Sequence, residues 1–123
     1  MSEPTLDGRL LQPADHPEGG EVDVETMFEF RQQGDLISAT YKGGAVRLGF
    51  LVGVRSGDRL EFRYVQVNRE GEISSGRSSD RIEILSDGRV RLHETWVWES
   101  RQGSGTSTLE EIDAEGTHRR PTA

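Results

Sequence analysis

The sequence predicts an all-β protein, a single antiparallel up-and-down β-barrel of about eight strands. Apolar and polar residues alternate in one segment after another, as they do when a strand buries one face. Turn-forming groups rich in glycine separate these segments at short, even intervals, and no segment shows helical periodicity. Because the strands follow one another without a long crossover connection, an up-and-down barrel is favoured over a β-sandwich.

The length of 123 residues favours one domain, large enough to bury a core without disulfides or a metal. We expect residues 1–20 to form an N-terminal arm that is partly disordered, residues 21–112 to form the barrel, and residues 113–123 to form a disordered tail. Within the arm, Leu6–Leu11 is a candidate short strand, and Pro13–Gly20 has the composition of an exposed loop.

Two segments form the first clear hairpin. Val24–Arg31 places Phe28 and Phe30 on one face, and Leu36–Tyr41 alternates in the same way. Gln33-Gly34-Asp35 separates them and has the composition of a turn. We therefore expect two antiparallel strands joined by a tight loop.

The middle of the chain continues the alternation. Gly43-Gly44 is a hairpin signal before the strand expected at Ala45–Val54. In that strand the even positions form one apolar face, which consists of Val46, Leu48, Phe50, Val52 and Val54. After Ser56-Gly57-Asp58, the strand expected at Arg59–Asn68 places on one face Leu60, Phe62, Tyr64 and Gln66.

The remaining expected strands are Glu72–Ser79, Arg81–Leu85, Val90–Glu99 and Thr106–Ile112. Ile73 is the apolar anchor of the first of these, and Ile82 and Ile84 anchor the second. The third has the sequence VRLHETWVWE, whose even positions carry two aliphatic residues and both tryptophans of the chain, with Glu94 among them. If this apolar face points inward, a carboxylate points inward too, and its burial costs free energy unless a partner offsets it.

The interior of such a barrel is mostly apolar, with a few polar groups that converge. Its expected wall consists of Phe28, Phe30, Ile37, Leu48, Phe50, Leu60, Phe62, Ile84, Leu92, Trp96 and Trp98. The candidate ligand-binding residues are Tyr41, Tyr64, Gln66, Arg77, Glu94, Trp96 and Trp98. Arg77 is the candidate cation beside Glu94, whereas Arg63 would need a bulge to reach it. The alternative is a filled core in which these polar side chains hydrogen-bond only to one another.

Composition excludes several classes of function. The formal charge of −7 argues against a nucleic-acid partner, and no apolar run is long enough to span a membrane. There is no cysteine, and His16, His93 and His118 fall in a loop, on an outer strand face and in the tail, so no metal site is expected. No cofactor motif is present. The N-terminus lacks the apolar core of a signal peptide, so we expect a cytoplasmic protein.

Two resemblances follow from specific motifs. Over residues 20–112, the segments FEFRQQGDLISATYKGG, RYVQVNREGE, SSGRSS and DGRVRLHETWVWES resemble a family of small bacterial proteins often labelled N-acetylglutamate synthase. An acetyltransferase of the usual kind needs an α/β fold and a pyrophosphate-binding loop before a helix. Neither pattern occurs in this sequence, so we do not expect acetyltransferase activity.

The second resemblance is to the avidin–streptavidin family of biotin-binding barrels. LISATY at Leu36–Tyr41 is similar to the second-strand motif, which implies that Tyr41 contacts a ligand, and HETWVWES is similar to a strand whose tryptophan, here Trp96, stacks on it. Ser107-Thr108-Leu109 is similar to part of the last strand, which would place Asp113 near the ligand-binding aspartate. The first-strand Asn-x-Leu-Gly-Ser signature is absent, and Ser75-Gly76-Arg77 replaces a tryptophan. The resemblance thus implies the fold more than the ligand.

Three functions remain open at this point. The first is a small-molecule-binding barrel in which Trp96 and Trp98 pack on the ligand and Tyr41, Tyr64, Gln66 and Glu94 bind its polar end. The second is a cyclase or isomerase that uses Glu94 as acid or base with Tyr64 as partner. The third is an interaction module with a filled barrel, for which a homodimer through outer strand faces is the expected form.

Overall fold

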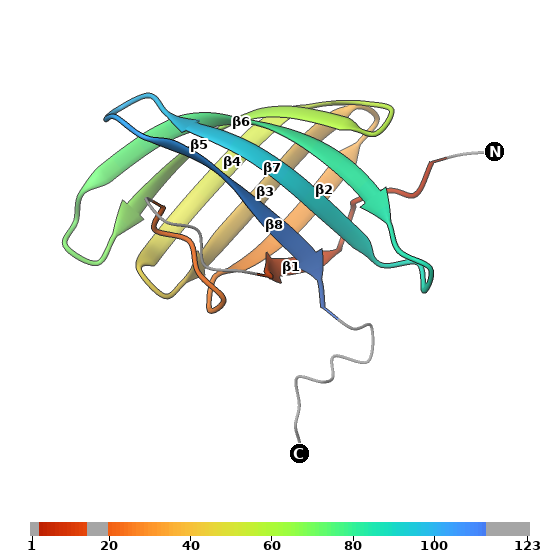
Figure 1. The fold of residues 1–123 in the computed structure, drawn as a ribbon, viewed down its shortest axis with the longest axis horizontal. Coiled ribbons are helices and arrows are strands. Elements are labelled where there is room, and N and C mark those ends of the chain that lie inside the picture. The colour runs from red at the N-terminus through yellow and green to blue at the C-terminus, as the bar shows by residue number, and fades with distance from the viewer. Residues whose placement is uncertain (1–2, 15–19, 113–123) are drawn as a thin grey trace, which may run out of the picture.

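The computed structural model describes residues 3–14 and 20–112, and these form an all-β closed barrel of eight antiparallel strands (Figure 1). Each strand pairs with its neighbours in the sequence, and the last strand pairs with the first, so the expected up-and-down barrel is confirmed. The strands are β1 (Leu10–Pro13), β2 (Met27–Gln33), β3 (Leu36–Gly43), β4 (Val46–Ser56), β5 (Arg59–Asn68), β6 (Ile73–Ile84), β7 (Val90–Trp98) and β8 (Ser104–Glu111).

The first strand lies inside the segment expected to be an arm. β1 pairs with β2 on one side and with β8 on the other, so this four-residue strand closes the barrel. Leu11 of β1 is fully buried, and so is Leu6, because the segment before β1 folds into the barrel end. The barrel therefore begins well before residue 21. The expected tail at residues 113–123, and much of the expected loop at Pro13–Gly20, lie outside the described residues.

The prediction for β4 is wrong over most of the strand. The register between β4 and β5 shifts between Val46 and Leu48, and a shift of one residue exchanges the two faces of a strand. Val46 is buried as expected, but Leu48 and Phe50 are 44% and 50% exposed and do not belong to the wall. After the bulge, the odd positions point inward, and Leu51 is buried in place of Phe50.

The sixth strand also differs from expectation. Ile73–Ile84 forms one continuous strand of 12 residues where the sequence suggested two strands with a break at Asp80. Ile73 is 68% exposed and is not an anchor, and Ile84, the last residue of the strand, is 42% exposed and does not belong to the wall. Ile82 is buried as expected, and the other inward positions of β6 carry Ser74, Gly76, Ser78 and Asp80.

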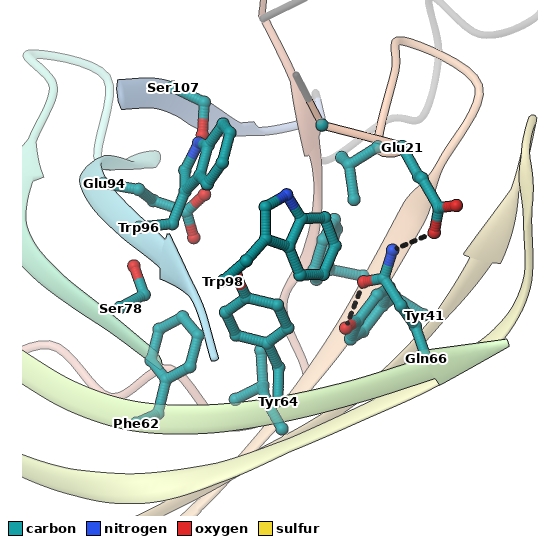
Figure 2. Close-up of a pocket in the computed structure, with 14 residues that line it drawn as sticks. Glu21, Tyr41, Phe62, Tyr64, Gln66, Ser78, Glu94, Trp96, Trp98 and Ser107 are labelled. Carbon is teal, nitrogen blue, oxygen red and sulfur yellow. Dashed lines mark hydrogen bonds between the residues drawn. The ribbon is translucent and has the colours of Figure 1, made fainter. Parts of the chain in front are cut away.

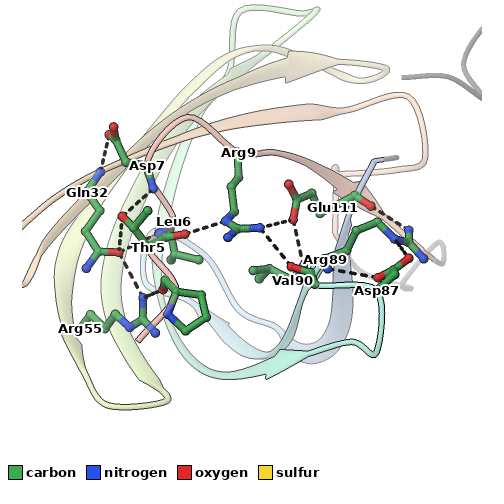
Figure 3. Close-up of polar contacts among 12 residues, drawn as sticks. Thr5, Leu6, Asp7, Arg9, Gln32, Arg55, Asp87, Arg89, Val90 and Glu111 are labelled. Carbon is green, nitrogen blue, oxygen red and sulfur yellow. Dashed lines mark hydrogen bonds and ion pairs between the residues drawn. The ribbon is translucent and has the colours of Figure 1, made fainter. Parts of the chain in front are cut away.

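One end of the barrel is closed by the segment before β1 (Figure 3). The backbone N–H of Leu6 donates to the Gln32 side chain at 2.9 Å, and Arg55 Nη1 donates to the Pro4 carbonyl at 2.7 Å. Arg9 Nη1 forms an ion pair with Glu111 Oε1 at 2.7 Å. These contacts join the segment to β2, β4 and β8. No helix in the described part of the chain is long and apolar enough to cross a membrane.

The two halves of the interior differ in composition. The half beneath the closed end is mostly aliphatic, and its fully buried side chains include Phe30, Leu6, Leu11, Ile37, Leu60, Leu92 and Leu109. The half toward the opposite end holds the tyrosines, the tryptophans and most of the buried polar groups. The cavity lies in this second half.

Candidate functional site

A cavity of about 50 Å³ lies in the aromatic half of the barrel (Figure 2). One water molecule needs roughly 10–15 Å³ on the same measure, so the cavity has room for a small chemical group. Every strand from β2 to β8 contributes a side chain, and the connection between β1 and β2 covers part of it. The lining consists of Gly20, Glu21, Val22, Phe28, Tyr41, Leu51, Phe62, Tyr64, Gln66, Ser78, Glu94, Trp96, Trp98 and Ser107.

Aromatic rings form much of the wall. Trp98 meets Trp96 edge to face at a centroid distance of 6.1 Å, and it meets Tyr64 in the same manner at 5.6 Å. Phe28 and Tyr41 stack at 4.4 Å. These are the distances and angles at which aromatic pairs attract one another, so the rings hold one another in place.

Glycines on the neighbouring strand make room for these rings. Tyr41 lies opposite Gly49 in the register, and Trp96 lies opposite Gly105. A Cβ atom added at Gly49 would lie 2.4 Å from the Tyr41 ring, and one added at Gly105 would lie 2.6 Å from the Trp96 ring. A side chain at either place would overlap the ring, so glycine allows each ring to pack directly against the backbone of the neighbouring strand.

A chain of hydrogen bonds crosses one side of the site. The Tyr41 hydroxyl donates to Gln66 Oε1 at 2.8 Å, and Gln66 Nε2 donates to Glu21 Oε1 at 2.8 Å. The other carboxylate oxygen of Glu21 accepts from Asn68 Nδ2 at 2.8 Å and lies 3.7 Å from the Arg101 guanidinium. Glu21 thus connects the segment before β2 to two residues of β5 and to Arg101.

A second polar group lies on the other side of Trp98 (Figure 2). Glu94 lines the cavity from β7, and its Oε1 accepts from the Ser107 hydroxyl of β8 at 2.9 Å. Asp80 is the register partner of Glu94 on β6 and is only 1% exposed. The Ser78 hydroxyl donates to Asp80 Oδ1 at 2.5 Å. Two carboxyl groups therefore meet across β6 and β7.

The environment changes the acidity of three of these groups. Burial raises the pKa of Tyr41, and the nearby Tyr64, Glu94 and Glu21 raise it further. Burial and then the charge of Glu94 raise the pKa of Tyr64, so both phenols remain protonated and act as hydrogen-bond donors. Burial raises the pKa of Asp80 well above its ordinary value, and the charge of Glu94 raises it further.

Six of the seven predicted ligand-binding residues line this one cavity, and these are Tyr41, Tyr64, Gln66, Glu94, Trp96 and Trp98. Whether they bind a ligand, or whether Glu94 and Tyr64 catalyse a reaction, stays a prediction. Arg77 does not line the cavity, because its position in β6 faces outward. The expectation that Arg77 or Arg63 pairs with Glu94 is wrong, since both guanidinium groups pair with Glu99 on the outer surface.

Several residues of the site were missed. Glu21 falls in the expected arm–barrel boundary, and nothing in its local sequence separates it from a loop residue. Asp80 was assigned to a break between two strands, although SSGRSSDRIEI alternates without interruption when it is read as one strand. Asp113 lies outside the described residues. No cluster of three His, Cys, Asp or Glu side chains able to hold a metal ion occurs in residues 3–14 and 20–112.

A closed eight-stranded up-and-down barrel with an aromatic interior belongs to the class of small antiparallel β-barrels that are wide enough for one small ligand. A family model described as avidin-like protein matches residues 4–112, which include all eight strands. The chain belongs to this avidin-like family, as the motifs in Leu36–Tyr41 and around Trp96 indicated. No curated protein and no solved structure matches the chain.

Proposed function

We propose that this protein binds a small organic molecule in the aromatic half of its barrel. One observation carries the proposal: four aromatic side chains, Tyr41, Tyr64, Trp96 and Trp98, meet the inward carboxylate of Glu94 around a single cavity. Apolar walls with a few converging polar groups are the usual composition of a small-molecule site. The avidin-like family typically binds small molecules, which supports the same function.

The proposal is tested by native mass spectrometry of the purified protein, with the mass of any released compound measured after denaturation. A metabolite panel is then screened by intrinsic fluorescence, because both tryptophans of the chain line the cavity. A bound compound should change the emission, and Trp96→Phe should weaken its affinity about tenfold through lost ring contact. Arg77→Gln, on the outer face, is the matched control and should leave affinity unchanged.

Two results would count against binding. One is a protein that releases no compound and whose fluorescence responds to no member of the panel. The other is a compound whose affinity is the same in the wild type and in Trp96→Phe, because such a compound would bind somewhere other than the cavity.

We also infer that two copies of the chain associate through the outer face of β3 to β6. The register shift in β4 turns a row of large apolar side chains outward, and neighbouring strands extend it. The exposed members of this outer apolar face are Leu36, Leu48, Phe50, Val52, Val54, Val65 and Ile73. These side chains are 43–68% exposed and together present roughly 600 Å² of apolar surface. An apolar patch of this area is at the upper end of what monomeric proteins expose, and it is close to the ~800 Å² that each partner buries in a stable interface.

The pairing is measured by light scattering after size-exclusion chromatography. Val52, which is 57% exposed within the outer apolar face, is changed to lysine, and Val24, which is 52% exposed outside it, is changed in the same way as a control. The wild type and Val24→Lys should have twice the monomer mass, and Val52→Lys should have the monomer mass. A wild type that is monomeric at high concentration would contradict the inference.

A further inference from the structure

Two acidic side chains face each other inside the barrel, where their negative charges have little water around them. Asp80 and Glu94 are directly opposite in the register between β6 and β7, and side chains in such pairs have Cβ atoms about 5 Å apart. Like charges at this distance destabilise the barrel unless one is neutralised. A proton on Asp80 is one way to relieve the repulsion, and a bound cation is another.

The buried acid Asp80 also has an oxygen without a hydrogen-bond partner. Among the described residues, Asp80 Oδ2 is the one buried side-chain oxygen or nitrogen without a hydrogen-bond partner within the structure. Unmatched buried oxygens are rare in native proteins and call for a proton, a water or a ligand. Ser78, which donates to the other oxygen of Asp80, itself lines the cavity, as Glu94 does, so Asp80 lies directly behind the cavity wall.

The rest of the lining has the chemistry that suits a cation. Glu94 and Glu21 are its ionisable carboxylic acids, and no Lys, Arg or His occurs among the lining residues in the described part of the chain. The faces of tryptophan and tyrosine rings attract cations. The ring of Trp98 already attracts one cation, because the guanidinium carbon of Arg101 lies 4.1 Å from its centroid.

We propose that the ligand inserts a small cationic nitrogen group, such as a guanidinium, amidinium or ammonium, between the aromatic wall and Glu94. Asp80 lies behind Glu94, receives no direct contact, and adds negative charge there where it is ionised. The cavity volume of about 50 Å³ limits the inserted part to a compact head group, so the remainder of the molecule extends out of the cavity. This assignment rests on the proposed binding function, because it names the chemistry of the same cavity.

The test compares two compounds of the same shape that differ in charge, n-butylguanidinium and n-butylurea. Binding to the purified protein is measured by calorimetry and by tryptophan fluorescence at low salt. The guanidinium should bind at least tenfold more tightly than the urea. Glu94→Gln, which keeps size and hydrogen bonding, should abolish this preference, whereas Glu99→Gln on the outer surface should retain it.

A second variant keeps the inference testable if Glu94→Gln does not fold. Asp80→Asn leaves the contact residue in place and, at a pH above the raised pKa of Asp80, should reduce the preference for the guanidinium severalfold, since it then removes a charge behind Glu94. Equal or tighter binding of the urea, binding of neither compound, or a preference that survives in Glu94→Gln would each overturn the inference. If neutral members of the metabolite panel still bind in the cavity, the proposed function stands while the cationic head group is refuted.

Discussion

The inverted face of β4 can be tested by truncating two neighbouring side chains. Leu51 is 3% exposed, so Leu51→Ala removes buried methyl groups from a closed interior, which costs about 3 kcal/mol. Phe50 is 50% exposed, and complete burial of a phenylalanine contributes roughly 1.5–3 kcal/mol, so Phe50→Ala should cost about 1 kcal/mol. The alternation of the sequence predicts the opposite order, because it places Phe50 in the wall.

Urea unfolding of the two variants measures these costs. With a slope of about 1.5–2 kcal/mol per molar urea, Leu51→Ala should lower the midpoint by roughly 1.5–2 M and Phe50→Ala by roughly 0.5 M. The measurements are made at two protein concentrations, because a contribution of Phe50 to a dimer depends on concentration and packing inside one barrel does not. A larger cost for Phe50→Ala at the lower concentration would refute the inverted register.

Three further outcomes follow from the cavity. Gly105→Ala should destabilise the fold by about 1–3 kcal/mol and shift tryptophan emission, because the new Cβ would overlap the Trp96 ring. Chemical unfolding measures the change in stability and fluorescence measures the shift. An unchanged emission spectrum would contradict the prediction. Tyr41→Phe should cost about 1–2 kcal/mol by leaving Gln66 Oε1 without its donor, and an unchanged urea midpoint would be the opposing result. Asp80 lies opposite Glu94, and its raised pKa stabilises the fold below the ordinary aspartate range. This contribution is lost as the pH rises through the raised value. The urea midpoint of Asp80→Asn should therefore be less sensitive to that rise when midpoints are compared across pH.

The sequence was sufficient to predict the architecture, because alternation and turn spacing are local signals that each strand repeats. Glycine at hairpin positions and the absence of helical periodicity determine the strand order once a barrel is assumed. The register of β4 could not be predicted, since nothing in its composition marks the bulge after Val46. In AVRLGFLVGV the larger apolar side chains fall at the even positions, so the outward row of Leu48, Phe50 and Val52 can be mistaken for the wall.

The site was predictable in part for the same reason. Tyr64, Gln66, Glu94, Trp96 and other inward residues of regular strands keep their expected faces. Glu21 reaches the cavity from a connection, and a contact of that kind depends on how the chain folds back over the barrel end. Asp80 needed a correct strand assignment for β6 before its parity could be read, so an error in one boundary hid the partner of Glu94.

The division of the interior into two halves explains how a small barrel can keep a cavity without losing stability. Fully buried aliphatic side chains such as Leu6, Leu60 and Leu92 fill the closed half, where burial contributes most. In the other half, the rings of Tyr41 and Trp96 lie against glycines, and the cavity beside them is lined by polar side chains as well. Because the two halves use different positions along each strand, substitutions in the cavity can change recognition while the closed half maintains the fold. This separation is what a binding barrel needs if its ligand specificity is to vary on a constant architecture.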